Sequence, residues 1–388
     1  MYKPKVTFWR VVLAIIFAAG LYATILRFSR GLGATTNLSD SFPWGLWIGF
    51  DVLCGVMMAA GGFTLTATVY IFNLKEFRPI VRPAILTAFL GYVLVVIALL
   101  FDLGRGYRIW HPLVMWNPRS VMFEVAWCVT LYTTVLALEF GPVIFERLRL
   151  KTLLRIQHAI SVPLVIAGVL LSMLHQSSLG SLYLIVPHKL HPLWYSPLLP
   201  IFFFLSAICV GLAMTIFESS ISARVFGKQL ELSLLVKLGR TLLVVLAVYA
   251  VLRFQDLHER AVLKLLAHPG YETDLFYLEA FIGLLLPIAL LLIPKVRESA
   301  RGLYVSAVLV VLGFIANRLN VSITGMETSA GLRYIPRWTE IAVTASIVAA
   351  AFVIFGLAVK YLPIFPPAQR RLEPEPQPSL IEITHART

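Results

Sequence analysis

The sequence predicts an all-α membrane protein, a polytopic bundle of ten transmembrane helices with both termini in the cytoplasm. Three observations predict it. Of the 388 residues 59% are hydrophobic and only 14% are charged, whereas soluble proteins carry about 25% charged residues. Ten apolar runs reach the roughly 20 residues that cross a bilayer. The basic residues gather between these runs mainly on one side, as the positive-inside rule describes.

The ten runs begin near Thr7, Trp44, Pro83, Val121, Gln157, Pro197, Val236, Asp274, Gly302 and Trp338. Of the 33 Lys and Arg, 21 lie at the two termini or in connections that follow even-numbered runs, and 12 lie in the other connections. This asymmetry predicts cytoplasmic termini. We assign residues 1–365 to the transmembrane domain. Residues 366–388 are rich in Arg, Glu and Pro and predict a disordered cytoplasmic tail.

The first run follows the basic stretch Met1–Arg10 without a clear signal-peptide cleavage site, so we expect a retained span. The second run carries small residues at Gly45, Gly49, Gly55, Ala59, Gly61 and Gly62. Such residues allow close approach of neighbouring backbones, which predicts a central position for this helix. Asp51 lies on the same run, about two turns from its outer end. A carboxylate there needs a partner or carries a proton.

The fifth run ends in the polar stretch Met173–Ser181, so His175 is expected near one edge of the hydrocarbon. Ionisable groups at membrane depth usually face the bundle interior and mark a functional site. The alternative is an interfacial residue that caps its helix. The outer connections, which are richer in Trp, Tyr, His and Pro than the inner ones, form the surface that a partner would meet.

We group the other polar residues by their expected depth in the membrane. Those of the outer half are Asp51, Asp102, Arg105, Glu124, Arg253, Glu279, Asn317, Arg318 and Glu340, and those of the inner half are Glu139, Glu218 and His158. For Arg105, Arg253, Arg318 and Glu340, snorkelling at helix ends is an equal alternative to a functional role. Glu139 and Glu218 fit either a proton route or a buried polar lock.

The histidines and cysteines argue against haem and iron–sulfur clusters in this chain. His158 and His175 lie within spans, but 17 positions apart on one helix, roughly 25 Å. They cannot face each other across a haem. The alternative is a haem held by His175 and a histidine of an outer connection, namely His111, His188, His191, His258 or His268. The three cysteines form no Cys-x-x-Cys pair. What remains is a membrane-edge pocket with imidazole, carboxylate and arginine side chains, which suits a quinone headgroup and its proton exchange.

Seven short motifs occur in an order typical of one family. They are Pro43–Asp51 (PWGLWIGFD), Gly61–Gly62, Asp102–Arg105 (DLGR), Phe123–Glu124, His175–Ser181 (HQSSLGS), His191–Trp194 (HPLW) and Leu362–Pro367 (LPIFPP). Over residues 7–367 the chain resembles the NrfD/PsrC superfamily of quinone-reactive integral membrane subunits. Within it the likeness is to the HybB group of bacterial hydrogenase-2.

The resemblance implies a haem-free, multi-pass subunit of the bacterial inner membrane that serves anaerobic respiration. It would bind a periplasmic iron–sulfur electron-transfer subunit, which exchanges electrons with the large and small subunits of a nickel–iron hydrogenase. It would exchange electrons with menaquinone or ubiquinone near the periplasmic face, with proton translocation proposed for the family. It would be the quinone-reactive subunit of the complex, and hydrogen activation would lie in the partner.

By position, the resemblance assigns His175, Asp102, Arg105 and Glu124 to the quinone site, with Asp51 as the next candidate. A proton route would draw on Asp51, Glu124, Glu139, Glu218 and Glu279.

Two alternatives stay open. One is a membrane anchor for another periplasmic oxidoreductase, such as a polysulfide, nitrite or other molybdenum enzyme. The other is a secondary transporter with intramembrane acids as ligands. Transporter sites lie near the midplane at broken helices, whereas here the acids favour the outer half and no corresponding pair of Gly/Pro-interrupted runs is visible. The net charge of +13 follows the connections between spans and indicates no nucleic-acid partner.

Overall fold

The computed structural model describes residues 7–227 and 230–365. Within these ranges ten helical segments are long and apolar enough to cross a membrane, which confirms the all-α, ten-span prediction. The predicted tail, residues 366–388, lies outside the described residues.

Six spans are single helices: α1 (Phe8–Arg30), α6 (Val121–Leu148), α7 (Lys151–Leu184), α8 (Leu199–Phe226), α9 (Leu232–Glu259) and α15 (Trp338–Tyr361). The third span is the 3₁₀ turn η4 (Lys75–Phe77) followed by α4 (Arg78–Asp102). Short elements in the connections are η1 (Leu32–Ala34), η5 (Gly106–Arg108), α5 (His111–Val114), η6 (Val262–Ala267) and α12 (Pro294–Arg297).

The other three spans contain π-helical turns. The second consists of η2 (Trp47–Cys54), α2 (Gly55–Met58), α3 (Gly61–Thr66) and η3 (Ala67–Ile71). The eighth consists of α10 (Tyr271–Ala280), η7 (Phe281–Leu285) and α11 (Leu286–Leu292), and the ninth of α13 (Ala300–Leu319), η8 (Asn320–Thr324) and α14 (Gly325–Ala330). These three irregular spans do not occupy corresponding positions along the chain.

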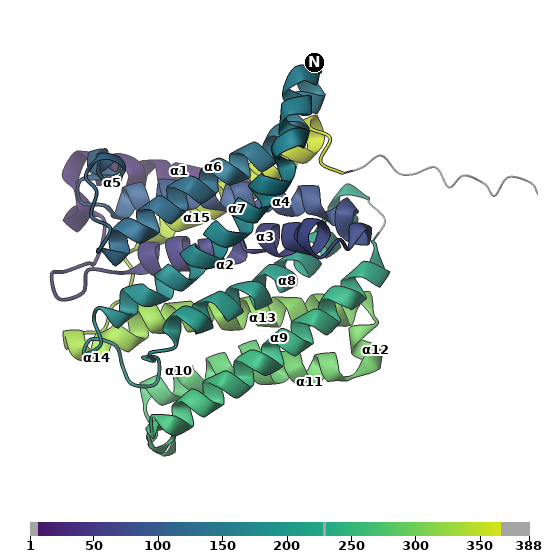
Figure 1. Cartoon of the computed structure of the whole chain (residues 1–388). Coiled ribbons are helices and arrows are strands. Elements are labelled where there is room, and N and C mark those ends of the chain that lie inside the picture. Colours follow the sequence, from purple (N-terminus) through teal and green to yellow (C-terminus); the bar gives the residue numbers. More distant parts are fainter. Residues whose placement is uncertain (1–6, 228–229, 366–388) are drawn as a thin grey trace, which may run out of the picture.

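The spans form two neighbouring four-helix groups (Figure 1). Spans two to five, ending with α7, pack in a closed ring, and spans six to nine, α8 to α14, pack in a second ring. α7 and the second span contact α8, so they join the two groups. The short elements α5, α10 and α14 lie at one end of the bundle and α12 lies at the other.

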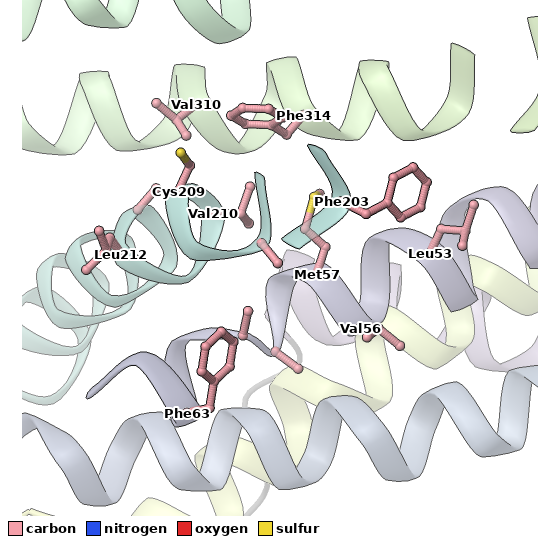
Figure 2. Packing of buried hydrophobic residues seen from close by; sticks show 14 of the residues in the cluster. Leu53, Val56, Met57, Phe63, Phe203, Cys209, Val210, Leu212, Val310 and Phe314 are labelled. Carbon is pink, nitrogen blue, oxygen red and sulfur yellow. The ribbon is translucent and has the colours of Figure 1, made fainter. Parts of the chain in front are cut away.

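The second span is central, as predicted. Of the residues in its most apolar stretch 72% are buried, the highest share among the ten described spans. Figure 2 shows its side chains, among them Leu53 and Met57, packed towards residues of α8 and α13. A Cβ atom on Gly211 of α8 would lie 2.8 Å from the backbone of Ala60, so glycine is needed where these two spans cross.

The first and last spans form a peripheral pair. α1 and α15 pack side by side, and Ser346 Oγ donates to the carbonyl oxygen of Ile16 at 3.0 Å. Only 17% of the most apolar stretch of each helix is buried, so both present most of their surface to lipid. Ten crossings return the chain to the face from which it started, so Phe8 and Tyr361 lie at the same face.

Two predicted helix ends were wrong. The fifth span was expected to end near His175 but runs to Leu184. The ninth span was expected to end before an outer connection at residues 321–337 but runs to Ala330. Polar composition does not end these helices because their hydroxyl groups are satisfied locally. Ser322 Oγ of the ninth span donates to the carbonyl oxygen of Arg318 at 2.8 Å, for example.

We predict that Gly313→Ala destabilises the fold, because the new Cβ atom would lie 1.9 Å from the Cα atom of Gly283. A loss of roughly 1–3 kcal/mol is expected from such overpacking. Gly356→Ala is the matched control, since nothing lies within 4 Å of its Cβ position. Thermal unfolding can be followed through the thiols of the buried free cysteines. Equal unfolding temperatures for the two variants would contradict the predicted close contact.

Candidate functional site

His175 lies inside the first four-helix group. Its side chain is fully buried, and Nδ1 lies 3.2 Å from the hydroxyl oxygen of Tyr92 on α4. The helix continues nine residues to Leu184, roughly 14 Å, so the predicted place at the edge of the span was wrong. The interfacial-cap alternative is excluded by the same observation.

The polar atoms around His175 are incompletely satisfied. His175 Nε2 and Gln176 Oε1 are buried and have no hydrogen-bond partner among the described residues. Gln176 Nε2 donates to the carbonyl oxygen of Val56 at 3.1 Å, which fixes this amide against the second span. The ring of Tyr132 stands edge-on to that of Tyr92, with centroids 4.6 Å apart. Buried polar atoms without partners are costly, and each calls for a ligand or a water molecule.

Glu124 lies one helical turn outward from His175. It occupies the first turn of α6 and its side chain is exposed. Its Oε1 accepts a hydrogen bond from Ser178 at 2.5 Å. Ser178 follows His175 by three residues on α7, so both side chains lie on one face of that helix. The structure therefore brings two of the predicted site residues together, with Ser178 between them.

Asp102 and Arg105 are arranged differently from the prediction. Asp102 is half-buried at the end of α4, whereas Arg105 is exposed beyond it. The cation at this helix end is Arg27 of α1, which donates to the carbonyl oxygens of Phe101 at 2.7 Å and Leu103 at 2.8 Å. The sequence did not indicate that Arg27 is buried, because an arginine at the end of a span is usually an interfacial charge. Its buried position depends on a helix that is distant in sequence.

Asp51 is also separate from His175. It is buried in the π-helical first part of the second span and accepts a hydrogen bond from Thr344 of α15 at 2.7 Å. The first turn of α15 also contacts the second span, since Trp47 Nε1 donates to the carbonyl oxygen of Glu340 at 3.2 Å. Asp51 thus has a neutral partner on the peripheral helix pair.

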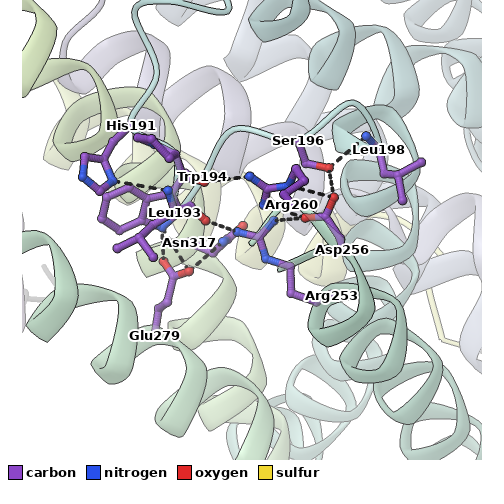
Figure 3. A network of polar contacts seen from close by, with 11 residues as sticks. His191, Leu193, Trp194, Ser196, Leu198, Arg253, Asp256, Arg260, Glu279 and Asn317 are labelled. Carbon is purple, nitrogen blue, oxygen red and sulfur yellow. Dashed lines mark hydrogen bonds and ion pairs between the residues drawn. The ribbon is translucent and has the colours of Figure 1, made fainter. Parts of the chain in front are cut away.

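Glu279 of α10 is the centre of a second polar network (Figure 3). Its carboxylate accepts hydrogen bonds from Trp194 Nε1 at 3.1 Å, Asn317 at 3.1 Å and Asn320 at 2.6 Å. Trp194 belongs to the connection between α7 and α8, and the two asparagines belong to the ninth span. A buried carboxylate with three neutral donors holds these segments together, which favours a structural lock.

The same connection is fixed at further points. Arg253 donates to the carbonyl oxygen of Leu193 at 2.7 Å, and Asp256 accepts from Ser196 at 2.6 Å. The His191 Nδ1 atom accepts from the amide of Leu193 at 3.3 Å, which requires an unprotonated nitrogen. Partial burial lowers the pKa of His191, and the nearby Glu272 carboxylate opposes this shift. The ring is therefore neutral at neutral pH.

Of the two alternatives for Arg318 and Glu340, snorkelling is excluded because both side chains are buried. Arg318 is buried and donates to Ser206 Oγ at 2.7 Å and to the carbonyl oxygen of Phe203 at 3.1 Å, with its guanidinium over the Phe203 ring. Glu340 is buried and accepts from the amide of Asn37 at 2.9 Å. Arg318 lies within the ninth span and packs against α8, whereas Glu340 is held by the connection that follows α1.

The inner acids do not pair with each other. Glu218 of α8 accepts a hydrogen bond from Thr87 at 2.7 Å, whereas Glu139 of α6 lies beside Gly168 of α7. His158 is exposed. No group of three or more His, Cys, Asp or Glu residues within the described ranges could hold a metal ion.

The family model for polysulphide reductase, NrfD, matches residues 34–330. This chain belongs to the NrfD family. It is 40% identical over 373 residues to a protein of Nitratidesulfovibrio vulgaris, covering 93% of this chain and 95% of that protein. It is 37% identical over 352 residues to the probable Ni/Fe-hydrogenase 2 b-type cytochrome subunit of Escherichia coli, covering 89% of each. It is 30% identical over 396 residues to the menaquinone reductase integral membrane subunit of N. vulgaris, covering 93% of this chain and 92% of that protein.

The match extends across both four-helix groups, so the resemblance stated from the short motifs is confirmed for the family. The same comparisons establish an integral, multi-pass membrane protein. Membership brings no residue assignments with it, so the quinone-site and proton-route residues stay predictions.

We predict that Glu279→Gln lowers stability by about 1–3 kcal/mol, because an amide nitrogen would then face donors that now share a carboxylate. The exposed Glu259→Gln is the control, since Glu259 accepts only from Gln255 of its own helix. Thermal unfolding of the purified protein measures both. An unfolding temperature of Glu279→Gln that matches the control would argue against the lock.

Proposed function

We propose that this chain is the quinone-reactive membrane subunit of a periplasmic nickel–iron hydrogenase of the hydrogenase-2 type. It passes electrons between a periplasmic iron–sulfur partner, joined to the large and small hydrogenase subunits, and the quinone pool. The 37% identity to the E. coli hydrogenase-2 subunit supports the hydrogenase assignment. The menaquinone reductase relative supports menaquinone as the quinone.

The observation that carries the proposal is the buried His175 with a free Nε2 atom. If Tyr92 O–H donates to Nδ1, the imidazole proton resides on Nε2 and can be donated to a quinone carbonyl. The free Oε1 of Gln176 can accept from the hydroxyl group of a reduced quinone. A donor and an acceptor without partners, in an otherwise apolar bundle, match in chemistry the two oxygens and the apolar tail of a quinone.

Glu124 supports the proton side of the reaction. Reduction of a quinone takes up two protons, and the exposed Glu124 carboxylate can exchange them with the outer solution. Ser178 lies between Glu124 and the turn that carries His175, so its hydroxyl can relay a proton inward. Asp51, Glu139 and Glu218 remain candidates for a longer proton route, whereas the three donors on Glu279 favour its structural role.

The second reading within the family is an anchor for another periplasmic oxidoreductase. The relative of 30% identity that belongs to a menaquinone reductase supports this alternative. A membrane domain does not by itself identify the catalytic partner. The transporter alternative has no support from the relatives. The absence of haem also stays a prediction, since the E. coli relative is named a b-type cytochrome. His175 and the exposed His158, on one helix, do not form a facing pair.

We predict that His175→Ala and Glu124→Gln each lower quinone-dependent turnover of the assembled complex by at least about tenfold, roughly 1.4 kcal/mol of barrier. Electron transfer from the partner to a soluble dye should persist, because the dye bypasses the quinone site. Lys189→Ala, an exposed change in the outer connection, is the control. Normal quinone turnover in both assembled variants would place the site elsewhere.

We predict cytoplasmic termini from the distribution of Lys and Arg. Reporter fusions at Thr388 and at Lys189 should give opposite compartments, cytoplasmic for the first and periplasmic for the second. Periplasmic exposure of the fusion at Thr388 would invert the assignment of the two faces and remove His175 from the periplasmic half.

A further inference from the structure

A surface hollow lies at the face of the bundle where α6 turns into α7 and α15 ends. Its volume is about 540 Å³, within the range of small-molecule sites. The lining residues are Glu146, Arg147, Arg149, Lys360, Tyr361, Leu362 and Pro363. It lies at the opposite end of α6 from Glu124, so it is separate from the proposed quinone site.

The hollow is strongly basic. Its one acid, Glu146, is already paired with Arg82 through contacts of 2.6 and 2.9 Å. Arg147, Arg149 and Lys360 are exposed and have no ion-pair partner among the described residues. Within residues 7–227 and 230–365, three cations therefore line the hollow and no unpaired acid balances them.

The surroundings of the hollow are those of a membrane interface. Tyr361 is 57% exposed at the last residue of α15, and Leu148, at the end of α6, is 60% exposed. Tyrosine at a span end favours the headgroup level, and a lysine beside it extends its ammonium group to the same level. Exposed leucine next to the cations offers apolar surface to an acyl chain.

We propose that this hollow binds the phosphate headgroup of an anionic phospholipid. Arg147 and Arg149 supply planar donors suited to phosphate oxygens, and Lys360 adds a third positive charge from α15. Basic pockets between transmembrane helices are suited to such headgroups. The bound lipid would join the α6–α7 turn to the last span, two segments that Arg82 already connects by donating to Glu146 and to the carbonyl oxygen of Pro363.

The test uses the full-length protein in a non-ionic detergent with a fluorescent short-chain phosphatidylglycerol as probe. Wild type should bind it at least about tenfold more tightly than the matching phosphatidylcholine. The double variant Arg147→Gln/Lys360→Gln should weaken binding by about 25-fold, from roughly fivefold per cation near a membrane surface. Arg149→Asn should weaken it by about fivefold, and asparagine tolerates the left-handed backbone at this position, with φ 58°.

The matched control is Arg78→Gln/Lys295→Gln, which also removes two exposed charges near inner span ends but leaves the hollow intact. Its binding should equal that of wild type. Equal weakening in the two double variants, or equal binding of the two lipids, would overturn the proposal. Displacement of the probe by inorganic phosphate at equal concentration would also overturn it, because the site would then serve a free anion.

Discussion

Hydrocarbon offers no hydrogen bonds, and this constraint governs where every polar group of the chain is found. Several buried charged groups of the described residues have partners within the protein. Arg27 binds the last carbonyl groups of α4, Thr344 donates to Asp51, and Glu279 has three donors. Among the described residues ten buried side-chain polar atoms have no hydrogen-bond partner, and His175 Nε2, Gln176 Oε1, Ser172 Oγ and the Tyr132 hydroxyl are four of them. Each such atom calls for an explanation, such as a water molecule or a ligand.

The second constraint is the close approach of helices around the second span. Lipid tails are as apolar as leucine, so burial of apolar surface contributes little to association between spans, and packing contributes most. Glycine at 211 lets α8 approach the Ala60 backbone, and the small side chains between them leave no room for lipid. The two four-helix groups thus share one rigid seam, while α1 and α15 remain outside it.

The sequence predicted the number and class of the spans well, because hydropathy over about 20 residues is a local property. It predicted helix ends poorly near Leu184 and Ala330, where polar side chains are satisfied by the helix itself or by distant segments. Tyr92 and His175 are 83 residues apart in the chain, so no local pattern could pair them.

The family motifs grouped His175, Glu124, Asp51 and Asp102 in one predicted site, but the structure connects only His175 and Glu124, through Ser178. Asp51 and Asp102 lie near α1 and α15, and only tertiary structure separates the sets. The order of motifs along the chain indicates membership of a family, but it does not indicate which of the motif residues are in contact in the folded protein.

The Glu279 network has a consequence for molecular recognition. By tying Trp194 to the eighth and ninth spans, it makes the connection between α7 and α8 a rigid template before any other subunit arrives. A docking protein then loses little binding free energy to loop ordering. Complex assembly becomes selective through shape and outward-facing side chains. Were the partner of the proposed complex to dock on this connection, exchange of a few outward-facing side chains would change the partner and leave the scaffold intact.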